Sequence, residues 1–313
     1  MDFHLSMARS VIGLLLLICM GTLLRRTGLL KEAHGDILTR IITHVTLPAM
    51  IFAAVSMTPF EPGKLLLAVV MIVAQLSCAL LGWLVARLTH MNRPQTGALV
   101  MGATFTSSGF LGYAVIKQVF GADKLALSDA AVASELGVAI IIFTLGIGIA
   151  MHYGGKGKVH GKKEMLRFFY SPIFLSLVLG IGVSFIKLPQ NMVVDILYTV
   201  LHTTGAANTL LVTVTIGLML HFRHFRRILP VIALICIIKL VVQPLLAFGQ
   251  AQVLHFPQLW QQIVVIEAAM PTAALSAVFA KRYGCDSELS AILVLATFFT
   301  SILTMLVMTV LLG

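Results

Sequence analysis

Polar and proline-containing interruptions lie near the middles of two otherwise apolar stretches, 95–119 and 258–283. Proline removes a backbone donor and clashes with the preceding helical turn, while glycine and serine weaken a helix and compete for its hydrogen bonds. Interrupted helices leave free N–H groups and positive dipole ends that can bind a carboxylate without a buried cation. The pattern therefore predicts a binding site for an organic anion. The predicted binding residues are Ser107, Ser108, Gly109, Met270, Pro271 and Thr272.

Three ionisable residues lie well inside the apolar stretches, away from their ends: Glu135, Lys239 and Glu267. A charge at the centre of a membrane helix costs about 2.5–3.5 kcal/mol on insertion scales, so each residue needs a partner, water or a proton. Glu267 lies one turn before Pro271 and is predicted either to take up a proton when substrate moves or to pair with Lys239. Glu135 is predicted either to share the proton-coupling role or to reach a water-filled vestibule.

The composition places these residues in a membrane protein. Of 313 residues, 59% are hydrophobic and 11% are charged, and the mean hydropathy is +1.00. Ten stretches approach the roughly 20 apolar residues that a spanning helix needs, and runs this long exclude the alternating pattern of a barrel. We expect an all-α polytopic membrane protein. The predicted spans are 7–24, 37–56, 65–86, 95–119, 127–151, 171–186, 193–220, 229–251, 258–283 and 289–312.

The chain contains two diverged copies of one unit. The segment AVIKQVFGAD, which starts at Ala114, reappears as AVFAKRYGCD from Ala277, a shift of 163 residues, and an earlier stretch repeats at a shift of 159. Each copy has five predicted spans, an odd number, so the second copy must be inverted, as in many transporters. We expect a first repeat at 1–151, a basic cytosolic linker at 152–170 and a second repeat at 171–313.

The two interruptions fall at corresponding places in the repeats, in spans 4 and 9. Broken helices at such places are the best sequence indication of a transporter's substrate site, and both spans are predicted to unwind and cross. The alternative is a proline kink in span 9 and a packed small-residue interface in span 4. For Thr272, the alternative is an N-cap of the second half-helix.

The net charge of +10 is explained by orientation in the membrane. With the N-terminus outside, the loops facing the cytosol carry fifteen Lys and Arg residues against five on the other side. This bias follows the positive-inside rule and predicts a multi-pass protein of the cytoplasmic (inner) membrane with both termini outside. We expect no nucleic-acid partner, and the basic linker at 152–170 can contact membrane lipid.

The sequence indicates no cofactor and no metal site. The four cysteines are scattered without a paired spacing. His221 and His224 lie among arginines, which predicts a solvated cytosolic end. The chain has no G-x-x-x-x-G-K-[ST] motif, which argues against ATP drive.

Several segments resemble the auxin efflux carrier family. They are EAAMPTAALSAVFAKRYGCD, LATFFTS, TLPAMIF, SGFLG and KLVVQP, and they occur in the family's order along the whole chain, whose length is similar to that of bacterial members. The family is related to the bile acid sodium symporters. The chain departs from it at Ser107, where asparagine is common, and at Ala114 and Asn208, where proline is common. These departures bear on which residues bind the substrate more than on which fold the chain adopts.

The resemblance implies a scaffold of spans 1, 2, 6 and 7 and a transport domain of spans 3–5 and 8–10, in which spans 4 and 9 cross. It also implies carriage of organic acids such as malonate or malate, an elevator-like movement, and a homodimer formed through the scaffold. Pro48 and Asn208 would face the crossing from the scaffold, although Asn208 could instead only bond across helices.

The leading function is therefore secondary transport of a small organic anion. An intramembrane enzyme with Ser107 or Ser108 as nucleophile is disfavoured, because a nucleophile needs a partnered base and the sequence offers no such arrangement. A membrane sensor that binds the ligand without moving it is the remaining alternative.

Overall fold

The computed structural model describes residues 3–31, 33–57, 61–121, 123–155, 169–186, 191–219 and 229–312. Within these ranges every regular element is helical, and extended backbone pairs only at Thr106 and Thr272. The central part of the predicted basic linker and the loop that carries His221 and His224 lie outside the described residues.

The first half of the chain is an all-helical series with short π-helical or 3-10 segments. It contains α1 (Phe3–Arg26), α2 (His34–Ile41), η1 (Ile42–Thr46), α3 (Leu47–Ser56), η2 (Pro62–Lys64), α4 (Leu65–Leu88), α5 (Arg93–Thr104), η3 (Ser108–Gly112), α6 (Tyr113–Phe120), α7 (Lys124–Ala131), η4 (Val132–Ala139), η5 (Ile142–Gly146) and α8 (Ile147–Gly154).

The second half of the chain has fewer such segments. It contains α10 (Pro172–Ser184), α11 (Met192–Ala206), α12 (Asn208–Met219), α13 (Leu229–Ile237), η6 (Ile238–Val242), α14 (Gln243–Val253), α15 (Gln258–Ala268), α16 (Leu275–Tyr283) and α17 (Ser287–Leu312).

Four uninterrupted helical segments of the described chain are long and apolar enough to cross a membrane. They are Ile37–Ser56, Pro62–Leu88, Lys124–Gly154 and Leu229–Val253, with mean hydropathies of 1.6 to 2.5. Large apolar side chains such as Leu80, Leu179 and Leu303 are more than half exposed, and lipid is the solvent that such surfaces require. The all-α, polytopic membrane class is confirmed.

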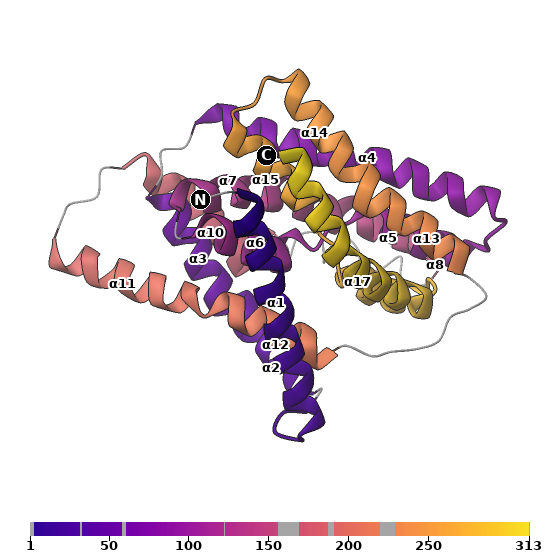
Figure 1. Cartoon of the computed structure of the whole chain (residues 1–313), viewed down its shortest axis with the longest axis horizontal. Coiled ribbons are helices and arrows are strands. Elements are labelled where there is room, and N and C mark those ends of the chain that lie inside the picture. The colour runs from indigo at the N-terminus through magenta and orange to yellow at the C-terminus, as the bar shows by residue number, and fades with distance from the viewer. Residues whose placement is uncertain are drawn as a thin grey trace.

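The helices pack in two sets. In one set α1 packs along α12, and α3 packs against α10 and α11. In the other set α4 packs against α5 and α14, α14 packs against α15, and α16 and α5 pack against α17. Figure 1 shows α4 and α14 side by side along one edge, well separated from α11. The two sets meet where α1 contacts α6 and α17 and where α3 contacts α7.

Turns that carry basic residues gather at one end of the second set. The Arg93 Nη2 donates to the His152 carbonyl at 2.8 Å, which joins the start of α5 to the end of α8. The Asp286 amide donates to the Pro94 carbonyl at 3.0 Å, which brings the turn between α16 and α17 to the same place. These turns are among those that the charge bias assigns to the cytosol.

The contact between α1 and α12 depends on glycine. A methyl group added at Gly217 would clash with the Ile18 carbonyl oxygen and lie 2.8 Å from the Thr22 amide nitrogen. Both neighbours are backbone atoms, so the helices would have to separate. Close backbone approach at small residues is how membrane helices gain packing energy.

We therefore expect Gly217→Ala to lower the stability of the protein by about 1–3 kcal/mol, the usual cost of overpacking. Thermal denaturation in detergent micelles would measure the change. Gly249→Ala is the matched control, because a methyl group on Gly249 of α14 would meet no atom within 4 Å. Equal melting temperatures for the two variants would contradict the proposed close contact.

Candidate functional site at the crossing of two interrupted spans

The fourth predicted span is interrupted after Thr104. Helix α5 ends there, Phe105 is extended with φ −88° and ψ 129°, and a new helical segment begins at Ser108. Serine and glycine at residues 107–109 favour the interruption because they weaken the helix and compete for its hydrogen bonds.

The ninth predicted span is interrupted around Pro271. Helix α15 ends at Ala268 and α16 begins at Leu275. Pro271 has no N–H to give to a helix, and its ring cannot follow a helical turn without a clash. The two interruptions therefore have different chemical causes, one from hydroxyls and glycine and the other from proline.

The two interrupted segments pair with each other in antiparallel fashion. The Ser107 amide donates to the Pro271 carbonyl at 2.8 Å, and the Ala273 amide donates to the Phe105 carbonyl at 2.9 Å. Backbone groups inside a bilayer must find partners within the protein. The pairing supplies partners to both interrupted segments at once, and it brings the spans together where they are interrupted.

Thr272 uses its polar groups inside the protein. Its amide donates to the Thr297 hydroxyl at 3.0 Å, and its own hydroxyl donates to the Gly102 carbonyl at 2.6 Å. The residue that precedes α16 is Ala274, and no side chain caps that helix. The predicted N-cap role of Thr272 is therefore wrong, because its hydroxyl is drawn across the crossing to α5.

The predicted binding residues differ in exposure. Met270, Pro271, Thr272 and Ser108 are buried, whereas Ser107 and Gly109 are partly exposed. A helix leaves the N–H groups of its first turn without intrahelical partners. Ser107 and Gly109, beside the first turn of η3, are thus the exposed part of the predicted site.

Glu135 lies in a buried polar cluster. Its side chain accepts a hydrogen bond from the Tyr113 hydroxyl at 2.8 Å and contacts the Ser134 hydroxyl at 3.5 Å. The Ser134 hydroxyl in turn bonds the Ser108 hydroxyl at 2.9 Å. Glu135 is only 3% exposed, so the alternative of a water-filled vestibule is wrong. Tyr113 and Ser134 were not predicted from the sequence.

Glu267 is fully buried beside the first turn after the span 4 interruption. A methyl group added at Gly112 would lie 2.5 Å from its Oε2 and 2.9 Å from its Oε1, so the carboxyl group packs directly on that glycine. Neither carboxyl oxygen has a hydrogen-bond partner among the described residues. A side chain at residue 112 would displace the Glu267 carboxyl group from its present position.

Lys239 does not pair with Glu267, and this alternative is wrong. The Lys239 ammonium donates to Gln243 Oε1 at 2.7 Å and to the Ala268 carbonyl at 3.2 Å. Ala268 is the last residue of α15, and carbonyls at a helix C-terminus lack intrahelical donors and carry partial negative charge. Lys239 is therefore positioned as a cap on the first half of span 9.

Gln243 caps the first half of span 4 in the same way. Its Nε2 donates to the carbonyl of Thr104, the last residue of α5, at 3.3 Å. Lys239 and Gln243 are both fully buried and lie four residues apart, so they occupy one face of one helix. Gln243 was not predicted from the sequence, although it lies four residues after Lys239 within the same apolar stretch.

Asn208 lies at a further interruption, within the seventh predicted span. Helices α11 and α12 are separated by Ala207, and Asn208 begins α12, which packs against η3. Asn208 is fully buried, and its Oδ1 accepts from the Thr46 hydroxyl at 2.9 Å. Its Nδ2 has no partner in the part of the chain described. Pro48 is partly buried in the first turn of α3.

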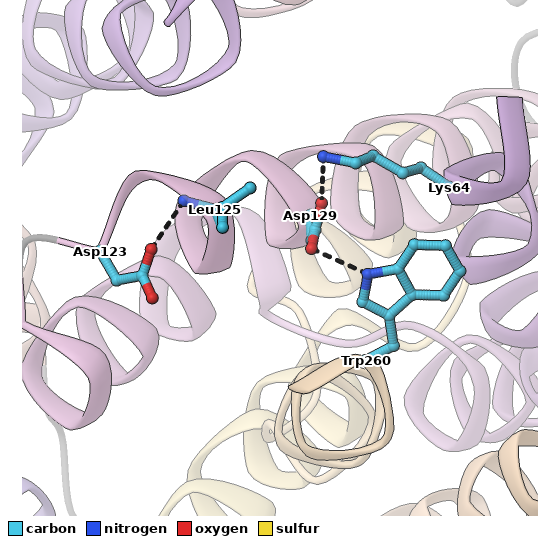
Figure 2. A network of polar contacts seen from close by, with 5 residues as sticks. All are labelled: Lys64, Asp123, Leu125, Asp129 and Trp260. Carbon is cyan, nitrogen blue, oxygen red and sulfur yellow. Dashed lines mark hydrogen bonds and ion pairs between the residues drawn. The ribbon is translucent and has the colours of Figure 1, made fainter. Parts of the chain in front are cut away.

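A buried ion pair joins three of the spans. Lys64 Nζ lies 2.7 Å from Asp129 Oδ1, and Trp260 Nε1 donates to Asp129 Oδ2 at 2.9 Å. Figure 2 shows the Lys64 and Trp260 side chains converging on the Asp129 carboxylate. Because Lys64 precedes α4, Asp129 lies in α7 and Trp260 lies in α15, the contact ties spans 3, 5 and 9 together.

Comparison with known proteins identifies the family. The family model described as membrane transport protein matches residues 6–309, so the chain belongs to this family, and the resemblance to the auxin efflux carriers is confirmed. The chain is 29% identical over 283 residues to an uncharacterized transporter of Methanothermobacter thermautotrophicus, and the match covers 90% of each chain. It is 25% identical over 296 residues to an uncharacterized transporter of Methanocaldococcus jannaschii, covering 92% of this chain and 94% of that one. The protein is a multi-pass membrane transporter.

Proposed function

We propose that the protein is a secondary transporter that moves a small organic anion, a carboxylate, across the cytoplasmic membrane. The observation that carries this proposal is the antiparallel pairing of two interrupted spans at Ser107–Pro271 and Phe105–Ala273. The pairing uses some backbone groups, while the first amides of η3 stay beside the partly exposed Ser107 and Gly109. Amides and hydroxyls of this kind bind a carboxylate without a buried cation.

Two inverted five-span repeats account for the arrangement of the helices. At a shift of 163 residues, the start of α7 at Lys124 corresponds to the start of α17 at Ser287. At the same shift Gly121 corresponds to Gly284. Each glycine follows the end of a helix and has a positive φ, 67° at Gly121 and 90° at Gly284. These correspondences support a fold of ten spans in which the crossing lies between the repeats.

The two packed sets of helices support a division into scaffold and transport domain. The set with α1, α3, α10, α11 and α12 corresponds to spans 1, 2, 6 and 7, and the other set corresponds to spans 3–5 and 8–10. In an elevator-like movement the second set slides against the first. The bond from Lys117 Nζ in α6 to the Gly205 carbonyl in α11, at 3.1 Å, crosses this boundary and would break during the movement.

The charge bias supports an orientation with both termini outside. The scaffold face is the proposed site of homodimer formation, which follows from membership of the family and not from contacts of this chain. Glu267, Glu135 and Lys239 are candidates for coupling transport to proton movement, and they differ in their hydrogen-bond partners.

The test is transport of labelled carboxylates by the purified protein. We expect malonate or malate to raise the melting temperature of the detergent-solubilised protein, since a ligand of the native state stabilises it, and to accumulate in proteoliposomes. Binding without accumulation would favour the sensor alternative. Failure of a panel of small carboxylates to bind or accumulate would contradict the anion assignment.

A further inference from the structure

Two carboxyl groups flank the same helical turn next to the crossing. Glu267 of α15 packs on Gly112, at the end of η3. Glu135 of η4 lies beside Gly109 of the same turn, because a methyl group there would lie 3.6 Å from its Oε1. The hydroxyl group of the adjacent Tyr113 donates a hydrogen bond to Glu135. The two acids therefore enclose the first turn after the span 4 interruption.

The two acids have different partners. Glu135 has a short hydrogen bond from Tyr113 and a longer contact with Ser134, and hydrogen bonds to a carboxylate stabilise its charge. Glu267 has no hydrogen-bond donor among the described residues, although it is 0% exposed. An ionised carboxylate with neither water nor donors is far more costly to bury than a neutral carboxyl group. Glu267 is therefore the member of the pair that is neutral in this conformation.

The neighbouring groups do not supply a counter-charge to Glu267. From span 4 the facing titratable group is Tyr113, and from span 5 it is Glu135. Lys239 from span 8 bonds Gln243 and the Ala268 carbonyl instead. Among the other titratable groups on the packed elements, Lys64 and Asp129 are paired with each other, Lys117 of α6 donates to the Gly205 carbonyl, and Arg87 of α4 lies over the Trp83 ring.

We propose that Glu267 binds an exchangeable proton whose binding is coupled to binding of the transported anion. This inference rests on the proposed function, because it assumes that the anion binds at the crossing. An anion near the start of η3 lies within about one turn of Glu267 and disfavours its ionised form through like-charge repulsion. Anion binding thus promotes proton uptake by Glu267, and reciprocity requires that the proton promotes anion binding. The expected stoichiometry is one proton carried with each anion.

The sign of the pH dependence follows from this linkage. Lowering the pH adds the proton and strengthens anion binding, whereas raising the pH removes it and weakens binding. A single linked proton changes the dissociation constant by at most about tenfold per pH unit. In Glu267→Gln the site is permanently neutral, so anion binding should stay near its low-pH strength and lose its pH dependence.

The first experiment needs no ligand. Infrared difference spectra of the purified protein at neutral pH are expected to show the C=O stretch of a protonated carboxylic acid. The band should disappear in Glu267→Gln and remain in Glu135→Gln. If the band is unchanged in Glu267→Gln, the inference is overturned. If Glu267→Gln does not fold, Gly112→Ala serves instead, because its methyl group presses on the Glu267 carboxyl group and should shift the band.

The second experiment measures coupling with malonate as the probe. At a pH high enough to have removed the carboxylic acid band, adding malonate to weakly buffered protein should cause proton uptake in the wild type and none in Glu267→Gln. Equal uptake in both proteins would overturn the inference. A melting temperature that depends on sodium instead of pH, with no carboxylic acid band, would also overturn it and point to a bound sodium ion. If malonate does not bind the wild type while the infrared band is present, the proton site stands and the choice of anion is wrong.

Discussion

Asp129→Asn is expected to destabilise the folded protein by about 3–5 kcal/mol, the usual cost of removing one partner from a buried ion pair. Lys64 and Asp129 have side chains only 4% and 2% exposed, so the Lys64 ammonium would remain buried without a counter-charge. The asparagine side chain keeps the size of aspartate and can still accept the hydrogen bond from Trp260. The loss of stability in Asp129→Asn therefore measures the contribution of the aspartate charge. Thermal unfolding in detergent, together with unfolding in SDS, would give its size.

The double variant Lys64→Met with Asp129→Leu provides the control. Replacing both members of a buried ion pair by apolar residues is often neutral or stabilising. We expect the double variant to recover most of the stability that Asp129→Asn loses. If the double variant were as unstable as the single one, the cost would come from packing around α7 and not from an unpaired charge.

The interruptions of the two spans were predictable because their causes are local. Serine and glycine at 107–109 and proline at 271 change the helix by themselves, whatever packs around them. The structure has both interruptions at these places. The pairing of the interruptions was predicted from the sequence repeat, because equivalent positions in two inverted copies would lie at the same depth.

The caps on the interrupted helices were not predictable in the same way. A lysine within an apolar stretch indicates only that some partner is needed, and a nearby acid such as Glu267 is the obvious choice. The structure gives Lys239 a carbonyl and an amide oxygen instead. Carbonyl groups at a helix end attract a cation as a carboxylate does, but the sequence does not show which helix end lies nearby.

The alternative role of Thr272 as an N-cap is wrong for a related reason. A threonine after a proline and before an apolar run has the local signature of an N-cap. Its hydroxyl instead reaches the Gly102 carbonyl across the crossing, because α5 ends beside it. Tertiary contacts within a bilayer compete strongly for each polar group, since water is not present to satisfy them.

Asp129 was missed because the sequence offers no reason to separate it from an ordinary loop acid. It lies near the start of a predicted span, close to the polar Lys124 and Asp123. Asp123 does behave as such an acid, since its carboxylate caps α7 through the Leu125 amide at 2.8 Å (Figure 2). Asp129 joins separate spans only because Lys64 and Trp260 approach it from other parts of the chain.

Lys239→Met is expected to reduce carboxylate uptake by at least tenfold, equivalent to about 1.4 kcal/mol. Without the ammonium group, the Ala268 carbonyl and Gln243 Oε1 both lose a buried donor, and Gln243 is less firmly held on the Thr104 carbonyl. The ends of α5 and α15 then move relative to each other, which displaces the amides that line the proposed anion site. Uptake into proteoliposomes and the dissociation constant for malonate would measure the change.

The melting temperature of Lys239→Met should change less than its uptake. Removing a buried charge relieves its desolvation cost, which offsets the cost of the two orphaned acceptors, about 1–3 kcal/mol each. Gln250→Met on the same span is the matched control, because the Gln250 side chain bonds only the Leu246 carbonyl of its own helix, at 3.0 Å. Lys239→Gln keeps a donor without the charge and should recover part of the uptake. Wild-type uptake in Lys239→Met would show that the crossing holds its geometry without this cap, since the antiparallel pairing at Ser107 and Ala273 would then suffice.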